Sequence, residues 1–218
     1  MNILKPQNNH IEKLKNENII NIQETEKITC CNFENEECNN INLYENEFEH
    51  CNFNNICMQN ALVEKITFRD TTFKQCNFSN TEFRECSFIR CEFNNCKISG
   101  CDFTENRLYN VSFIETNANY INLSMASIEN ILFKDTSLEE SYFQETKIKN
   151  IYFNNANLRQ AQFFKTSLKN IDLSNSQIEG IAISLEDIKG AIIDQIHAQA
   201  EILHAEIHPE VSGVLFPV

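Results

Sequence analysis

Four cysteines spaced five residues apart are the side chains of this sequence that could most directly do chemistry. Cys86, Cys91, Cys96 and Cys101 could in principle supply four thiolates to a structural zinc ion. Zinc sites, however, usually contain cysteine pairs about two to four residues apart whose thiolates converge. An even spacing of five does not fit that pattern, and small buried thiols explain it better. We therefore expect neither a metal site nor a cofactor.

A second candidate group lies near the C-terminus. His197, Glu201, His204 and His208 recur at spacings that place them on one face of a helix, where they could bind a divalent metal. The same spacing is typical of the solvated face of an amphipathic helix, which is the better interpretation. The sequence contains no nucleophile elbow, phosphate-binding loop, dinucleotide-binding fingerprint or HExxH motif. We therefore expect that the protein is not an enzyme.

The cysteines belong to a repeat with a period of five residues. Large apolar residues, most often Phe, stand at every fifth position from Phe33 to Ile183, and only Cys38, Met58 and Ala118 depart from this rule. A small residue, usually Cys, Ala, Thr or Ser, often precedes each central residue by two positions. Because side chains two apart in an extended chain point the same way, each unit turns one large and one small side chain inward.

A period of five fits neither a helix nor a plain strand, so the chain must bend once per unit. The sequence has only 4 Gly and 3 Pro, which makes Asn the obvious turn residue. Every twentieth residue from Phe33 to Phe153 is Phe, whereas the neighbouring series from Cys38 is mixed. A coil that closes after four units explains this difference, since the Phe rings then stack. The pattern predicts an all-β, four-sided solenoid that is roughly 37 Å long at about 4.8 Å per coil.

This pattern resembles the pentapeptide-repeat family, whose unit is Ala-(Asp/Asn)-Leu-x-x with Phe common at the centre. The resemblance covers residues 28 to 193 and implies a right-handed quadrilateral parallel β-helix with a short C-terminal α-helix. The units that carry it most clearly are CNFSN at 76–80, CEFNN at 91–95, CDFTE at 101–105, ANLRQ at 156–160 and AQFFK at 161–165.

We expect three parts in the chain. Residues 1–27 fall out of the five-residue phase and form an N-terminal cap or a partly disordered segment, and residues 28–193 form the β-helix. Residues 194–218 form a helix, for which Asp194 can serve as N-cap, and an apolar tail. The tail either folds back to cap its own coil or forms a dimer interface. In relatives that protect DNA gyrase from quinolones the C-terminal end forms a two-fold dimer, and the resemblance implies the same role for Ile196, Leu203, Ile207, Leu215 and Phe216.

The net charge of the chain limits the classes of partner that it can bind. The net charge of −13 and the pI near 4.8 disfavour direct binding to nucleic acid. No signal peptide and no apolar run long enough to span a membrane is evident, so we expect a cytoplasmic protein without membrane contact. One outward series of the repeat carries an excess of acids, which we predict to bind a partner: Glu45, Glu64, Glu82, Glu85, Asp102, Glu105 and Glu145.

The resemblance to gyrase-protecting members implies a DNA mimic that binds the DNA-binding saddle of a type II topoisomerase, especially DNA gyrase. Residues 28–183 carry a net charge of −8, whereas a duplex about 37 Å long carries roughly 22 negative charges. Mimicry would therefore rest on one acidic face and on shape. The chain also lacks the projecting loops of Gram-negative resistance proteins. The alternative is a structural or scaffolding module whose flat sides bind another protein.

Overall fold

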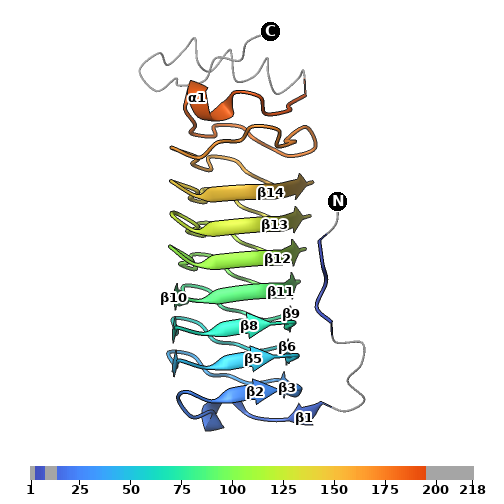
Figure 1. Ribbon diagram of the computed structural model, residues 1–218, viewed down its shortest axis with the longest axis vertical. Helices are drawn as coiled ribbons and strands as arrows, with labels where there is room; N and C mark the ends of the chain where they lie inside the picture. Colours follow the sequence, from blue (N-terminus) through green and yellow to red (C-terminus); the bar gives the residue numbers. More distant parts are fainter. Residues whose placement is uncertain (1–2, 8–13, 195–218) are drawn as a thin grey trace.

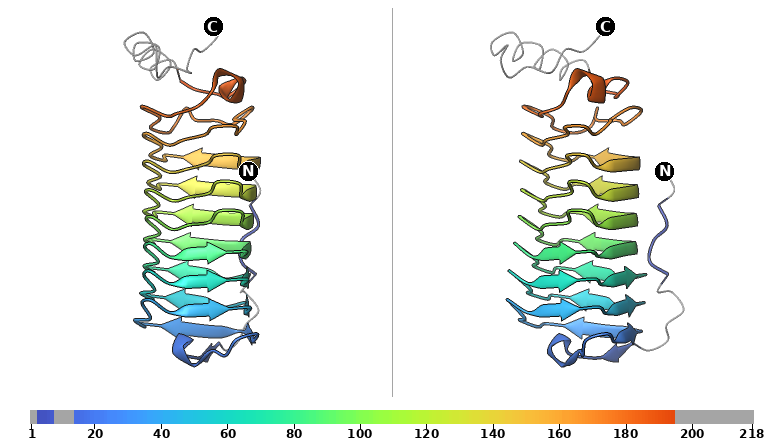
Figure 2. Two further views of the ribbon diagram at one scale, coloured as in Figure 1. Left: turned by 90° about the vertical axis from the view of Figure 1, so that its left-hand side faces the viewer. Right: turned by 60° about the vertical axis from the view of Figure 1, so that its left-hand side comes forward.

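The protein is a four-sided parallel β-helix in the computed structural model, which describes residues 3–7 and 14–194. The chain climbs in right-handed coils from the base of a straight rod to its C-terminal end (Figures 1 and 2). Each strand from β2 onward pairs in parallel with a strand twenty residues away, as the strand of Phe53 does with those of Phe33 and Phe73. The predicted solenoid and its twenty-residue coil are therefore confirmed.

The strands are short because each side of a coil is a single five-residue unit. Most contain three residues, and four longer strands continue across a corner. The elements are β1 (Lys15–Asn16), the 3-10 helix η1 (Ile19–Asn21), β2 (Lys27–Thr29), β3 (Cys31–Glu34), β4 (Asn42–Tyr44), β5 (Glu47–Glu49), β6 (Asn52–Asn54), β7 (Leu62–Glu64), β8 (Thr67–Arg69), β9 (Thr72–Lys74), β10 (Glu82–Arg84), β11 (Ser87–Asn94), β12 (Arg107–Ile114), β13 (Ser127–Lys134), β14 (Lys147–Asn154) and α1 (Leu185–Ile188).

The repeat divides the rod into four faces. Face 1 contains the units centred on every twentieth residue from Phe33, face 2 those from Cys38, face 3 those from Leu43 and face 4 those from Ile28. Face 1 carries β3, β6 and β9, face 3 carries β4, β7 and β10, and face 4 carries β2, β5 and β8. The four strands β11 to β14 each run from face 4 onto face 1. Face 2 is joined by isolated parallel bridges.

The chain turns each corner at the fifth residue of a unit. All 29 described non-glycine residues with positive φ, from Thr25 to Asn170, occupy this position, and 11 of them are Asn. Asn tolerates the left-handed region better than most residues, which fits the predicted use of Asn in the turns. At Gly100, with φ of +67°, an added Cβ would lie 2.5 Å from Asn80 Oδ1. A side chain at this position would therefore require the Asn80 side chain to move.

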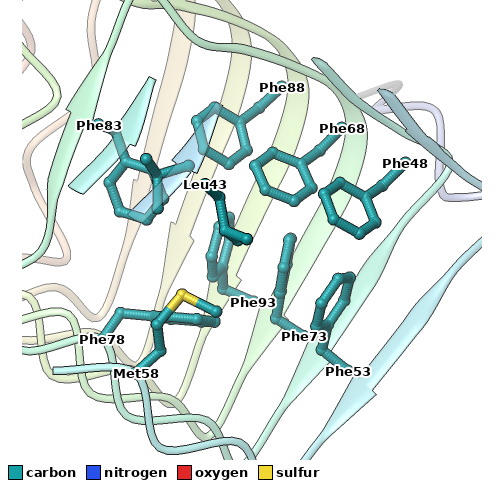
Figure 3. Close-up of a pocket in the computed structure, with 11 residues that line it drawn as sticks. Leu43, Phe48, Phe53, Met58, Phe68, Phe73, Phe78, Phe83, Phe88 and Phe93 are labelled. Atoms are coloured by element: carbon teal, nitrogen blue, oxygen red, sulfur yellow. The ribbon is translucent and has the colours of Figure 1, made fainter. Parts of the chain in front are cut away.

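The core consists of columns of stacked rings, as predicted for face 1. Neighbouring Phe rings of that column, from Phe33 to Phe153, stack with centroids 4.4 to 5.6 Å apart. A second column on face 4, Phe48, Phe68 and Phe88, meets the first edge to face (Figure 3). The gap between these columns has a volume of only about 10 Å³. The interior of the coils from Leu43 to Phe93 is therefore packed, with room for about one water molecule at most.

The small inward positions tie successive coils together through side-chain hydrogen bonds. The Cys91 thiol donates to Phe68 O at 3.4 Å, and the Cys101 thiol donates to Phe78 O at 2.8 Å. The Thr136 hydroxyl makes the equivalent bond to the carbonyl of Phe113 at 3.0 Å. Each of these bonds spans 23 residues along the sequence. Cys and Thr are thus interchangeable at these positions because each offers one donor to the coil below.

The N-terminal segment closes the base of the rod. β1 pairs with β3 at a separation of sixteen residues rather than twenty, since Lys15 lies beside Cys31. After β1, Ile19 is buried, and its N–H donates to Glu36 Oε2 at 2.9 Å. Glu36 occupies an inward position that is small or apolar in nearly every other unit. Its carboxylate holds the segment over the first coil.

A short helix, α1, lies near the C-terminal end, in agreement with the predicted fold class. α1 starts at Leu185, and the Ser184 side chain accepts a hydrogen bond from Asp187 N at the N-cap. A further helix is predicted from the sequence after Asp194. That range lies outside the described residues, as do the predicted dimerisation residues Ile196, Leu203, Ile207, Leu215 and Phe216 and the histidine-rich group His197, Glu201, His204 and His208.

The stacked core predicts a large cost for removing one ring. Phe113 is fully buried between Phe93 and Phe133, with centroid distances of 5.0 and 4.9 Å. We expect Phe113→Ala to lower the free energy of unfolding by about 3–5 kcal/mol, as measured by urea titration. Phe164 is 43% exposed, so Phe164→Ala serves as the control and should change stability by less than about 1 kcal/mol. Equal effects in the two variants would contradict the stacked core.

The buried thiols predict a loss of stability at alkaline pH. Burial raises the pKa of Cys86 and Cys91 from 9.0 to about 12, so the native state keeps protons that the unfolded chain loses above about pH 9. The free energy of unfolding should then fall by about 1.4 kcal/mol per pH unit for each thiol, until the native thiols also ionise. Urea titrations between pH 8 and 11 measure this slope. Cys91→Thr should make it shallower, and an identical slope in wild type and variant would sink the explanation.

Candidate partner-binding surface

The seven predicted acids all lie on face 3. Glu64 is the last residue of β7, and Glu82 begins β10 and forms a bridge with Asp102 one coil further on. The other four, Glu45, Glu85, Glu105 and Glu145, are fifth residues of their units, with φ between 52° and 61°. They therefore stand at the corner between faces 3 and 4, where the side chain projects away from the core. One straight surface thus carries all seven carboxylates.

Three of these acids are neutralised by a neighbouring base. Lys65 Nζ lies 3.6 Å from Glu45 Oε1, Arg84 Nη2 lies 2.5 Å from Glu82 Oε2, and Lys165 Nζ lies 2.7 Å from Glu145 Oε1. The hydrogen bond from Lys165 to Glu145 raises the pKa of that lysine. Because all three pairs are exposed, they add little to stability. Their main effect is to cancel charge on the surface.

The other four acids form a compact negative patch. Glu64, Glu85, Asp102 and Glu105 occur in three successive coils, and none of them forms an ion pair with another described residue. Coils rise by about 4.8 Å, so Glu85 and Glu105 stand directly above one another at that spacing. Asp102 accepts a hydrogen bond from Thr104 N at 2.9 Å, which fixes its orientation. This patch is the part of the predicted site whose carboxylates form no ion pair with a described residue.

The upper coils of face 3 carry exposed apolar side chains that the sequence analysis did not single out. The exposed fractions are 48% for Met125, 38% for Tyr142, 43% for Phe164 and 46% for Leu185. Phe164 follows the buried Phe163 in the unit AQFFK and therefore stands at an outward position of the repeat. An aromatic residue at an outward position is the sequence signal from which this exposed apolar surface could have been predicted. Exposed apolar residues gathered on one face are typical of an interaction surface. Face 3 therefore has an acidic lower half and an apolar upper half.

The neighbouring face 4 has the opposite charge in its upper coils. Lys147, Lys149, Lys169 and Lys189 point outward there, and only Lys149 forms an ion pair with a described residue, at 2.6 Å from Glu129 Oε1. The lysines of face 4 are thus concentrated toward the C-terminal end. A partner that bound the acids of face 3 would be repelled if it continued around the corner onto these lysines.

The described residues offer few places for catalysis or metal binding. No cluster of three or more His, Cys, Asp or Glu side chains suited to a metal ion occurs among residues 3–7 and 14–194. The four evenly spaced cysteines instead donate their thiol protons to carbonyls on four different sides of the core. The pairs are Cys86 with Val63, Cys91 with Phe68, Cys96 with Phe73 and Cys101 with Phe78. Within the same residues, no helix has the length and apolar character needed to cross a bilayer.

A polar hollow of about 220 Å³ lies at the base of the rod. It is lined mainly by the cap and the first coil, including Lys15, Glu17, Asn21, Glu26 and Lys27. Lys27 lies 3.4 Å from Glu47 and 3.0 Å from Glu49, so its ammonium group already has partners. The lining also includes Cys31, but burial raises the pKa of its thiol, which disfavours the reactive thiolate.

The repeat matches a known family. Residues 86–163 match the family model described as a pentapeptide repeat region, and the same unit continues in unbroken parallel register on both sides of that range. The chain is a pentapeptide-repeat protein. A search among curated proteins returned no match for this pentapeptide-repeat chain.

Solved structures with a similar course of the chain include other pentapeptide-repeat proteins. Full-length QnrB1, a plasmid-mediated fluoroquinolone resistance protein, is 20% identical over 88% of this chain and 94% of its own, with a TM-score of 0.39. HetL, from the cyanobacterium Nostoc sp. strain PCC 7120, is 13% identical over 77% of this chain and 91% of its own, with a TM-score of 0.29. At these identities and TM-scores the two structures say nothing about what this protein binds.

The unpaired acids predict an unusual stability effect. Glu64, Glu85 and Asp102 repel one another and make no ion pair, so neutralising one should leave the free energy of unfolding unchanged within about 0.5 kcal/mol or raise it slightly. We expect this result for Glu64→Gln and Glu85→Gln in urea titrations at low salt. A loss above about 1 kcal/mol in either variant would show that these carboxylates are structural.

Proposed function

We propose that this pentapeptide-repeat protein is a non-catalytic binding protein whose face 3 docks on the basic, DNA-binding saddle of a type II topoisomerase, DNA gyrase in particular. Occupation of the saddle competes with DNA and so reduces cleavage that quinolones stabilise. The protein acts in the cytoplasm as a homodimer joined through the C-terminal residues Ile196, Leu203, Ile207, Leu215 and Phe216. It needs no cofactor and does not bind nucleic acid directly.

The single observation that carries this proposal is the unpaired acidic patch of Glu64, Glu85, Asp102 and Glu105 on a flat wall of the rod. Carboxylates that form no ion pair within the rod can pair with lysines and arginines of a partner without first breaking ion pairs of their own. Because the coil spacing is regular, Glu85 and Glu105 recur about 4.8 Å apart along one corner, with Glu64 and Asp102 beside them on the same wall. A DNA-binding surface carries basic side chains that can pair with such carboxylates.

The magnitude of the charge decides how the partner is recognised. A net charge of −8 over residues 28–183 is about a third of the roughly 22 charges on a duplex of the same length. General attraction to basic proteins is therefore modest, and recognition depends on face 3. The lysines in the upper coils of face 4 further restrict the orientation in which a basic surface can approach.

A second candidate function follows from the apolar half of face 3. DNA has no counterpart to exposed Met125, Tyr142 and Phe164 at the side of its backbone, and aromatic residues are enriched at protein–protein hot spots. This observation favours a scaffolding module that binds a protein partner through a mixed acidic and apolar surface, whether or not that partner is a topoisomerase.

Gyrase assays test the leading proposal. We expect the purified protein to inhibit supercoiling at micromolar concentration and to reduce ciprofloxacin-stabilised cleavage. Replacing Glu64, Glu85 and Glu105 by Gln and Asp102 by Asn together should weaken both effects at least about tenfold, because the charge pairing with the saddle is lost. Raising the salt concentration should weaken the wild type more than the variant.

A matched control uses acids of face 1. Replacing Glu34, Glu92 and Glu115 by Gln and Asp135 by Asn removes the same number of negative charges, four, from a wall that the proposal leaves unused, and this variant should retain full activity. If wild-type protein leaves supercoiling and cleavage unchanged, the topoisomerase proposal fails. The scaffolding module would instead be supported by two results together. A pull-down with the wild-type protein would yield a main partner other than a topoisomerase, and the double variant Tyr142→Ala with Phe164→Ala would no longer bind that partner.

A further inference from the structure

A short N-terminal segment lies against the rod far from face 3. Residues 3–7 run along the corner between face 4 and face 1, beside the coils of β8, β11 and β12 (Figures 1 and 2). Leu4 contacts a later coil than Gln7 does, so the segment runs opposite to the climb of the coils. An extended peptide is therefore already seated on this corner.

The segment is held through its main chain by side chains of the corner. Leu4 N–H donates to Asn110 Oδ1 at 3.3 Å, and Gln7 N–H donates to Asp70 Oδ1 at 3.0 Å. Asp70 and Asn110 occupy equivalent positions two coils apart, which corresponds to about 9.6 Å. Three residues of extended chain span about 10 Å. The coil spacing thus matches the spacing of every third N–H group in an extended peptide.

The corner is built as a polar ladder of His50, Asp70, Arg90 and Asn110. Arg90 Nε and Nη2 lie 2.7 and 2.5 Å from the two carboxylate oxygens of Asp70, which is only 1% exposed. Burial opposes ionisation of Asp70, but the hydrogen bonds from Arg90 and Gln7 outweigh it, and the pKa of Asp70 is lowered. Its carboxylate is thus fixed and charged, ready to accept an N–H.

The ladder has unused hydrogen-bonding capacity. Asn110 is 1% exposed, yet its Nδ2 group has no hydrogen-bond partner among the described residues, and the same holds for His50 Nδ1. Above Asn110 the ladder continues with Asn130, Asn150 and Asn170, where Asn150 Nδ2 donates to Asn130 Oδ1 at 2.9 Å. The corner therefore offers amide groups beyond the length that residues 3–7 cover.

The seated segment buries little apolar surface. Leu4 is 45% exposed, and Lys5 and Gln7 are exposed as well. Recognition through main-chain N–H groups depends weakly on side-chain identity, and a segment with so few apolar contacts opens at low free-energy cost. Another extended peptide could take its place.

We propose that the ladder of Asp70 and Asn110 between faces 4 and 1 is a binding site for an extended peptide, and that residues 3–7 are its resident ligand. The site reads every third main-chain N–H of the peptide, and a second copy of the N-terminal segment is the simplest occupant in trans. It is independent of face 3, because the corner joins the two faces that do not belong to the acidic surface.

Cleavage of the full chain between the segment and β1 makes the site testable. A protease recognition sequence replaces residues 8–13, and the nicked protein is separated from the released peptide. We expect a fluorescent peptide of residues 1–9 to rebind saturably in fluorescence anisotropy, and to bind the uncut chain at least about tenfold more weakly, since there the tethered segment occupies the site at high effective concentration.

Variants identify the contact. Asn110→Gly removes the acceptor, and its φ of +54° suits glycine, so we expect about a fivefold loss of peptide affinity without unfolding. Asn95→Gly, at φ of +53° on another corner, is the matched control and should bind the peptide normally. A peptide N-methylated at Leu4 and Gln7 should not bind. Failure of the peptide to rebind, or equal binding of the methylated peptide, would overturn the proposal.

Discussion

The left-handed residue at the end of each five-residue unit is the constraint on which the structure depends. With φ near +55° at this position, the chain turns a corner after every unit and closes a coil after four. Because the turn recurs without insertion, residues twenty apart lie in parallel register over the whole rod. The ring stacks, the carbonyl bonds of Cys and Thr and the flat faces all follow from that register. An L-residue in this region carries a conformational cost, which Asn reduces and which the stacked core offsets.

The same constraint confines function to the surface and the ends. The inward side chains fill the interior, so the cysteines act as small packing residues and hydrogen-bond donors rather than as ligands. Most outward positions lie outside the packed core, which leaves each face free to carry its own chemistry. On face 3, an acidic patch lies in the lower coils and an apolar patch lies in the upper coils.

The fixed coil spacing also turns equivalent positions into ladders. Side chains at one corner repeat at about 4.8 Å, so a row of them can meet an extended chain or a line of charges in register. At the corner between faces 4 and 1, Asp70 and Asn110 meet the main chain of residues 3–7 in this way. On face 3 the aligned groups are carboxylates. One geometric rule thus generates two chemically different surfaces.

The sequence by itself determined the solenoid, the twenty-residue coil, the Phe column of face 1 and the placement of seven acids on one face. A five-residue period read over most of the chain fixes which side chains point inward, and the coil length follows from the pattern of Phe. Tertiary structure alone decided which charges are cancelled, because the pairing of Glu45 with Lys65 and of Glu145 with Lys165 depends on rotamers in adjacent coils. It also decided the positions of Ile19 and of residues 3–7, which lie outside the repeat, and the presence of the short helix α1 at 185–188. Periodicity assigns a direction to each side chain, but contacts of segments without the period depend on three-dimensional packing.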